Sequence, residues 1–213
     1  MARITVIGGT GYAGAAIVAE AAARGHEVTS VSRNEPAAPV AGVAYVRGSA
    51  LDDQVRTRAF DDADAVVTAT SPRGDMALQQ VPLAGQLAST AGSTGVPLVV
   101  IGGFSSLRPA PDAPRFIEGD VPAEYREEAL AGHLILEMLK TTPEEVQWTF
   151  VSPAATFGAF APGETTGSYR LGGEVAMFDS EGTSYISAGD LAKAVLDIVE
   201  SGTHRREHVS VVS

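Results

Sequence analysis

The chain has 213 residues, 45% of them apolar, which is enough to form the core of one large α/β domain. Its 26 acidic and 15 basic residues give a formal net charge of -11, which disfavours nucleic acid and anionic membranes as partners. The absence of cysteine excludes disulfides, thiolate nucleophiles and cysteine-bound zinc, and no apolar run approaches the ~18 residues of a membrane span, so we expect a cytoplasmic protein.

Strands rich in β-branched residues alternate with helices along most of the chain. The predicted strands are 3–7, 27–32, 43–46, 63–69, 98–101 and 147–151, and the predicted helices are 12–24, 51–60, 76–90 and 125–140. Residues 103–124 contain four prolines and are expected to form a long loop. This alternation predicts an α/β, Rossmann-type doubly wound, mostly parallel sheet with helices on both faces.

The C-terminal part has shorter elements. Short strands are predicted over 168–171, 174–178 and 184–187, with a turn at 179–182 between the last two. Ser187 and Asp190 match a capping box that opens a helix over 188–200, and a last strand follows over 208–212. We expect a small C-terminal extension on the substrate side, and residues 1–213 as a single domain without repeats or linkers.

Residues 8–14, Gly-Gly-Thr-Gly-Tyr-Ala-Gly, join the first predicted strand to the first predicted helix. Gly8 permits a tight turn, Gly11 lets the backbone approach a pyrophosphate, and Gly14 lets the helix and strand pack closely. Unpaired N–H groups at the positive end of the helix then face the phosphates. We therefore predict a dinucleotide site with Gly8, Thr10, Gly11, Tyr12 and Gly14 against the cofactor; the alternative is a purely structural glycine turn.

The three glycines are spaced G-x-x-G-x-x-G, as in the extended and atypical short-chain dehydrogenase/reductases. Further matches are Val-Ser-Arg-Asn at 31–34, Val-Arg-Gly-Ser at 46–49, Ala-Val-Val-Thr-Ala at 65–69, Trp-Thr-Phe-Val-Ser-Pro at 148–153 and Ile-Ser-Ala-Gly-Asp-Leu-Ala at 186–192. The chain resembles the atypical branch, which contains NADH-flavin reductases, biliverdin-reductase-B-like proteins and nitrogen-metabolite regulators. This resemblance implies the fold and a nicotinamide cofactor, but it does not specify a substrate.

The end of the second predicted strand bears on which cofactor is bound. NAD sites place an acidic residue about 20 residues past the glycines, whereas this chain has Ser32 and Arg33 there. Arg33 can bind a 2′-phosphate through a charge-assisted fork, and Ser32 can add a hydroxyl. We therefore expect NADP(H), with NAD(H) left open through Glu35 if the strand ends later, and with a solvated surface arginine as the other interpretation of Arg33.

Ligands of open α/β sheets bind at the carboxyl ends of the strands, so residues after the other strands are site candidates. The resemblance implies that Ser49, Ala50 and Leu51 lie beside the adenine, although the family often has an acidic residue near Ser49. Ala69 and Thr70 would lie beside the ribose next to the nicotinamide. The other candidates are Gly102 and Pro153 for the cofactor, Ser105, Tyr125 and Ala155 for a substrate pocket, and Ser106 and Arg73 for polar contacts that could equally be structural.

Short-chain dehydrogenases transfer a proton with a Tyr-x-x-x-Lys pair, in which the ammonium lowers the pKa of the phenol. The residues four positions after the five tyrosines are Ala16, Ser49, Ala129, Gly173 and Gly189, so no such pair exists. Tyr125 lies closest to the family's catalytic position, and a phenol packed at a helix start is the alternative. The four histidines show no metal-binding spacing, so no metal site is predicted, and the catalytic residues are not identified.

These observations favour a reductase that passes hydride from NADPH to a small electron-poor acceptor, such as a flavin, a quinone or an activated carbonyl. The second hypothesis is a regulatory protein that binds NADP(H) and senses its redox state without turnover. A third, an enzyme similar to epimerases or dehydratases, would need an acid–base pair that the sequence does not show. The expected partner is a small molecule, and the protein is expected to be a monomer or homodimer.

Overall fold

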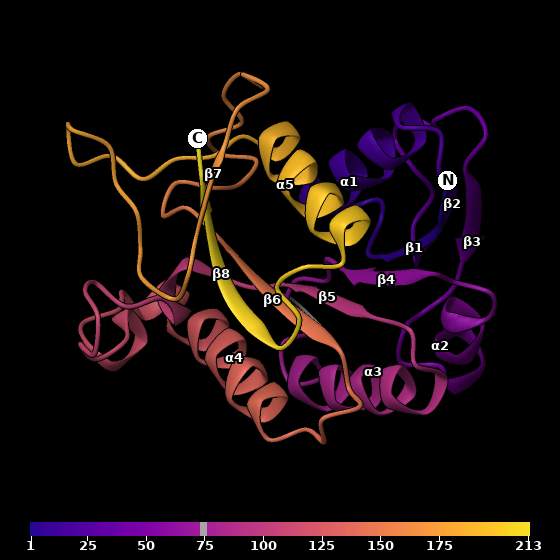
Figure 1. Cartoon of the computed structure of the whole chain (residues 1–213), viewed down its shortest axis with the longest axis horizontal. Helices are drawn as coiled ribbons and strands as arrows, with labels where there is room; N and C mark the ends of the chain where they lie inside the picture. The colour runs from indigo at the N-terminus through magenta and orange to yellow at the C-terminus, as the bar shows by residue number, and fades with distance from the viewer. Residues whose placement is uncertain (73–75) are drawn as a thin grey trace.

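The computed structural model describes residues 1–72 and 76–213, so the Arg73 prediction lies outside the described residues. The described strands form one sheet in the order β3-β2-β1-β4-β5-β6-β8-β7 (Figure 1). Seven of them pair in parallel, and β7 alone runs antiparallel, against β8. The strands are β1 (Arg3–Ile7), β2 (Glu27–Ser32), β3 (Ala44–Arg47), β4 (Ala65–Thr68), β5 (Leu98–Ile101), β6 (Trp148–Pro153), β7 (Arg170–Gly172) and β8 (Glu207–Val212).

Helices cover both faces of the sheet (Figure 1). Helices α1 (Tyr12–Ala23) and α5 (Ala188–Ser201) pack together on one face, and α2 (Asp53–Phe60), α3 (Gln80–Thr94) and α4 (Ala123–Lys140) cover the other. Neighbouring strand residues belong to opposite cores: Val67 packs with the α1 and α5 side, and Val66 packs with the α2 to α4 side. The predicted Rossmann-type, doubly wound, mostly parallel fold is therefore confirmed.

The observed boundaries of the helices and strands differ by a few residues from the predicted ones. The largest difference is α3, which spans Gln80–Thr94 instead of 76–90 and ends at Gly95 in a left-handed conformation with φ 72°. A glycine just past the last helical residue commonly ends a helix. Here Gly95 determines where α3 ends more than the spacing of apolar residues does. Helix α4 starts at Ala123, directly after Pro122, because proline suits a helix start.

Two of the predicted C-terminal strands are wrong. Residues 174–178 form only an isolated bridge between Val175 and Arg108, and 184–187 only one between Tyr185 and Thr156. The first ladder does not extend because the chain turns after Arg108: the Ala110 carbonyl, which the next rung would use, accepts instead from Ala113 N over 3.2 Å. The turn between these segments is present, with Gly182 N donating to the Asp179 carbonyl over 3.2 Å.

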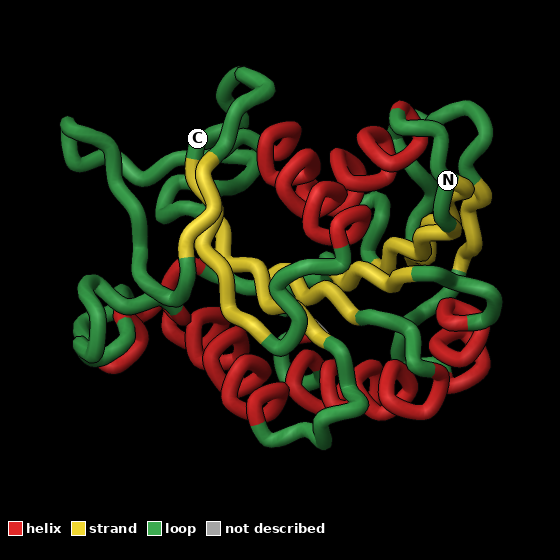
Figure 2. The backbone as a smooth tube through the Cα atoms, in the orientation of Figure 1, coloured by secondary structure: helices red, strands yellow, loops and turns green. Residues whose placement is uncertain are grey.

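Two long, mostly irregular stretches lie on the same side of the molecule (Figure 2). The first, 103–122, contains the short 3-10 turns η2 (Phe104–Ser106) and η3 (Phe116–Glu118), and the second runs from 154 to 187 around β7. The buried Arg115 joins them, because its guanidinium donates to the Ser106 carbonyl and to Glu174. The second stretch is the predicted C-terminal extension.

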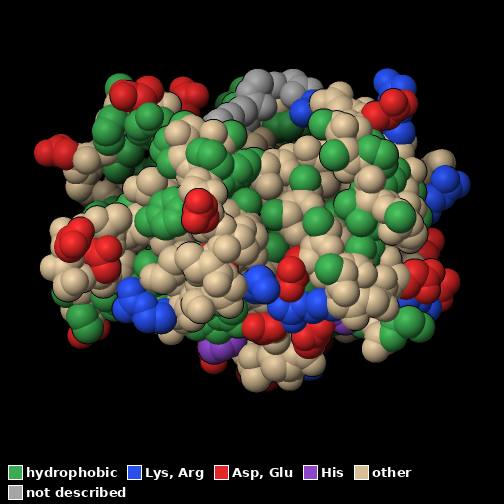
Figure 3. Space-filling view, turned by 90° about the horizontal axis from the view of Figure 1, so that it is seen from above, with side chains coloured by type: hydrophobic (Ala, Val, Ile, Leu, Met, Phe, Trp, Pro, Cys, Tyr) green, Lys and Arg blue, Asp and Glu red, His purple; other side chains and the backbone are tan. Residues whose placement is uncertain are grey.

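Acidic and basic side chains lie side by side at one edge of the face covered by α1 and α5 (Figure 3). At the end of α1, Arg24 pairs with Glu20 of the same helix and with Asp197 and Glu200 of α5. Among the residues that the structure describes, no helix is both long and apolar enough to cross a membrane.

Candidate functional site

The glycine turn has a backbone path that only glycine can follow at two positions. Gly8 has φ 83°, and a Cβ atom there would lie 2.8 Å from the Ala69 carbonyl oxygen. A Cβ atom at Gly14 would lie 2.1 Å from the Gly8 carbonyl oxygen, which is closer than any real contact. Helix α1 starts after Gly11, and no described side chain caps it. The turn therefore presents helix N–H groups toward the carboxyl edge of the sheet, as an anion site requires.

Ser32 supports this turn from the neighbouring strand. Its hydroxyl oxygen accepts a hydrogen bond from Thr10 N over 3.1 Å. Gly9 packs against β2 as well, since a Cβ atom there would lie 2.4 Å from Ser30 Oγ. The structure thus gives Ser32 a positioning role that the sequence did not predict, and its hydroxyl proton can still be donated to another group.

The side chain of Arg47 reaches the backbone of Arg33 where β2 and β3 end. Strand β2 ends at Ser32, as predicted, so Glu35 lies beyond the strand. Arg47 pairs with Ser32 in the parallel register, and its Nε donates to the Arg33 carbonyl oxygen over 3.3 Å. Both arginines are exposed. Arg47 is not among the predicted site residues; the parallel pairing of the second and third predicted strands is the signal that would indicate it.

The residues after β3 form a tight turn. Ser49 Oγ accepts from Leu51 N over 3.3 Å, and the buried Ala50 carbonyl accepts from Arg56 over 2.8 Å. Leu51 is 38% exposed. Ala50 is therefore a core residue, while Leu51 is the predicted adenine neighbour whose side chain reaches the surface.

Ala69 and Thr70 follow β4, directly beside the glycine turn. Ala69 N donates to the Ile7 carbonyl over 2.8 Å, which continues the pairing of β4 with β1 past the end of the strand. Thr70 Oγ1 donates to Gln80 Oε1 over 3.2 Å. The first part of the site thus lies where the strand order reverses, the usual ligand position in such sheets.

Gly102 directly follows β5, and Pro153 is the last residue of β6. Gly102 N donates to the Val151 carbonyl over 2.8 Å, and a Cβ atom there would lie 2.1 Å from the Phe150 ring. Ser152 Oγ donates to the Gly103 carbonyl over 2.9 Å and lies 2.8 Å from His208 Nε2. Since the serine has one proton, His208 is the donor in the second bond, and this pair fixes the turn after β5.

The three predicted substrate-pocket residues differ in exposure. Ser105 is partly buried in η2, Ala155 is exposed just after β6, and Tyr125 is 57% exposed in the first turn of α4. Ser106, by contrast, is buried, and its hydroxyl has no partner among the described residues. No hydrogen bond in the described part of the chain joins a tyrosine hydroxyl to a lysine.

Aromatic rings surround this edge of the sheet. Tyr12 and Phe157 lie 5.3 Å apart between ring centroids, so the stretch after β6 contacts the start of α1. On the other side, Phe104 lies 4.7 Å from Phe116 and 6.3 Å from Phe178. Phe157 therefore lies beside the start of α1, and the Phe104 ring lies in the stretch after β5, next to Ser105.

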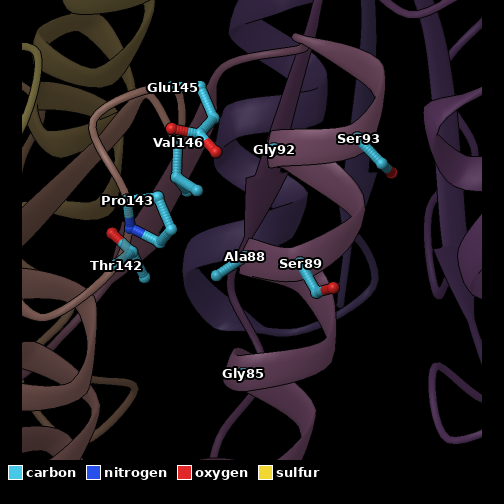
Figure 4. Close-up of a pocket in the computed structure, with 9 residues that line it drawn as sticks. All are labelled: Gly85, Ala88, Ser89, Gly92, Ser93, Thr142, Pro143, Glu145 and Val146. Carbon is cyan, nitrogen blue, oxygen red and sulfur yellow. The ribbon is translucent and has the colours of Figure 1, made fainter.

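A separate cavity of about 390 Å³ lies away from these residues (Figure 4). It is bounded by the second half of α3 and by residues 142–146, which precede β6, so it lies toward the amino ends of the strands. Small side chains such as Ser89 and Ala88 line it, together with Glu145. None of the predicted site residues takes part in it.

Comparison with known proteins agrees with this geometry. The profile of the NAD(P)H-binding family matches residues 8–202, so the chain belongs to that family. It is 34% identical over 219 residues to the uncharacterised protein YwnB of Bacillus subtilis strain 168, covering 99% of this chain and 98% of the other.

Solved structures show the same likeness. A protein of Streptococcus pneumoniae TIGR4 provisionally named an NADH-flavin reductase is 31% identical, with a TM-score of 0.89 and complete coverage of both chains. A protein of Bacteroides thetaiotaomicron provisionally named an epimerase is 29% identical, with a TM-score of 0.87 and coverage of 99% of this chain and 96% of the other. The resemblance to the atypical short-chain family is thereby confirmed.

Proposed function

We propose that this protein is an NADPH-dependent oxidoreductase that passes hydride to a small electron-poor acceptor: a flavin, a quinone or an activated carbonyl. The observation that carries the proposal is the pair Arg33 and Arg47 beside the glycine turn, with Ser32 at the end of β2 where an NAD site has a carboxylate. Two guanidinium groups suit a 2′-phosphate, because each can donate charge-assisted hydrogen bonds to phosphate oxygens.

We assign the cofactor contacts to residues at the carboxyl edge of the sheet. Residues of the turn from Gly8 to Gly14 hold the pyrophosphate through backbone N–H groups. Residues after β3 border the adenine, and those after β4, β5 and β6 border the nicotinamide half. The assigned set is Gly8, Thr10, Gly11, Tyr12, Gly14, Ser32, Arg33, Arg47, Ser49, Ala50, Leu51, Ala69, Thr70, Gly102 and Pro153.

The residues around the nicotinamide end support such an acceptor. A bound nicotinamide supplies the hydride from its C4 atom. Ala155 leaves room for a planar acceptor, while Ser105 and Tyr125 provide hydroxyl groups at its rim. An acceptor that takes its proton from water needs no tyrosine–lysine pair, and the S. pneumoniae relative named for flavin reduction supports this class.

The test is oxidation of NADPH, followed by its absorbance, with a free flavin, a quinone and an activated aldehyde as acceptors. We expect turnover with at least one of them, above a control without protein and above Gly14→Ala. Tight NADPH binding without oxidation by any acceptor would contradict the reductase. That outcome would instead support the redox-sensing regulator, which requires different affinities for NADP⁺ and NADPH.

A further inference from the structure

A chain of three polar side chains lies at the carboxyl end of β4. Thr68 Oγ1 and Thr70 Oγ1 are 3.2 Å apart, and Thr70 Oγ1 is 3.2 Å from Gln80 Oε1. Because the Thr70 proton is donated to Gln80, Thr68 must be the donor in the first bond. Thr70 Oγ1 therefore keeps one lone pair that can accept a hydrogen bond from a ligand.

The side-chain amide of Gln80 is buried, but only its oxygen is hydrogen-bonded. The residue is 4% exposed, and its Nε2 group has no hydrogen-bond partner among the described residues. A buried donor without an acceptor costs about 1–3 kcal/mol, so an acceptor is expected when the protein functions. Its neighbour Gln79, one position earlier, is exposed.

This polar chain lies beside the predicted cofactor turn. Gly8 approaches the Ala69 carbonyl so closely that a Cβ atom would be 2.8 Å away, and Thr70 is the next residue. Strands β1 and β4 are neighbours at the point where the strand order reverses. A dinucleotide that crosses this point has its pyrophosphate on the glycine turn and its second ribose past the end of β4.

We propose that Thr70 and Gln80 together recognise a hydroxyl group of the ribose attached to the nicotinamide. A hydroxyl is both a donor and an acceptor, so it can donate to the free lone pair of Thr70 Oγ1 and accept from Gln80 Nε2. Gln80 also positions Thr70 by fixing the direction of its proton. This inference rests on the dinucleotide binding in the proposed function, but not on the 2′-phosphate preference or on turnover.

The test compares three ligands of increasing length by calorimetry: ADP, ADP-ribose and NADPH. Gln80→Leu removes both amide groups, and Gln80→Glu keeps the acceptor for Thr70 but removes the donor. We expect each variant to bind ADP-ribose and NADPH about 3- to 10-fold more weakly, as loss of one hydrogen bond implies, and to bind ADP as the wild type does. The matched control is Gln79→Leu on the exposed neighbour, which should bind all three ligands like the wild type.

Thr70→Val provides a second variant of similar size, and it should give the same pattern. An equal loss for ADP would overturn the inference, since it would indicate general damage to the site. A loss that begins only with NADPH would also overturn it, because the contact would then be with the nicotinamide ring and not with the ribose. Wild-type protein that binds neither NADPH nor NADH would instead contradict the proposed function, and ADP-ribose tests Gln80 whichever cofactor is preferred.

Discussion

At the scale of single residues, the tightest backbone packing in the site is at Gly14, where helix α1 passes the carbonyl oxygen of Gly8. Gly14→Ala would place a methyl carbon 2.1 Å from the Gly8 carbonyl oxygen, so the turn must open. We expect the variant to lose the thermal stabilisation that NADPH gives the wild type. Gly85→Ala in α3 is the matched control, because nothing lies within 4 Å of its Cβ position; it should keep cofactor binding and gain about 0.5–1 kcal/mol of stability.

His208 should make the free energy of unfolding depend on pH. Burial, together with the nearby Arg115 cation, lowers the pKa of His208 to about 3. The unfolded chain therefore binds one more proton than the folded protein between pH about 3 and 6.5, so stability falls as pH falls through this window. The slope for one group is at most about 1.4 kcal/mol per pH unit.

His208→Gln tests this, since glutamine can still donate to Ser152 but does not titrate. Unfolding by denaturant at several pH values should show a smaller loss of stability toward low pH in this variant than in the wild type. His204→Gln, on a partly exposed ring near the surface, serves as the control. Parallel pH profiles for the wild type and His208→Gln would show that His208 is not the group responsible.

At the scale of elements, α5 anchors the irregular stretch after β6 through Asp190. Its carboxylate accepts from Thr166 N over 3.0 Å, Gly167 N over 2.7 Å and Ser187 Oγ over 2.9 Å. Burial alone would raise the pKa of Asp190, but these hydrogen bonds outweigh burial and lower it. The predicted cap is present, with Asp190 N donating to Ser187 Oγ, but the carboxylate holds the loop instead of returning to the cap backbone.

Asp190→Asn should therefore loosen the 154–167 stretch while α5 stays folded. The amide replaces one acceptor oxygen by a donor, so at least one loop N–H loses its partner. We expect a loss of about 1–3 kcal/mol in unfolding free energy and faster proteolytic cleavage within this stretch. Asp120→Asn, at an exposed position, should change neither; equal cleavage rates in all three proteins would refute the anchoring role.

The regular elements were predictable because their signals are local. The order of the β-branched run at 3–7, the glycine turn and the first helix was enough to predict where the pyrophosphate end of the site lies. The β-branched run at 98–101 likewise predicted a strand of the sheet. Two contacts were not predicted, because each depends on how separate segments meet: that of Arg47 with the Arg33 carbonyl and that of Gln80 with Thr70. The strand predicted over 174–178 failed for the same reason: it meets the loop at Arg108 in a single isolated bridge.

At the scale of the whole molecule, a strongly acidic protein has to bind an anionic cofactor. The net charge of -11 disfavours anions in general, so we expect the local cations at the ends of β2 and β3 to determine whether the 2′-phosphate of NADP(H) is bound. The same edge of the sheet carries the glycine turn, the two threonines at the carboxyl end of β4 and the small residues after β6. The proposed NADPH site therefore requires that a cofactor with a 2′-phosphate lie across that edge.

The most direct measurement is the affinity of the wild type, Arg33→Ala and Arg47→Ala for NADPH and for NADH, with Arg58→Ala, at an exposed position of α2, as the control. Loss of charge-assisted hydrogen bonds should weaken NADPH binding about 10- to 100-fold in the first two variants and leave NADH nearly unchanged. The control should bind both cofactors like the wild type. Equal effects on NADPH and NADH, or a wild type that prefers NADH, would contradict the assignment of this site to NADPH.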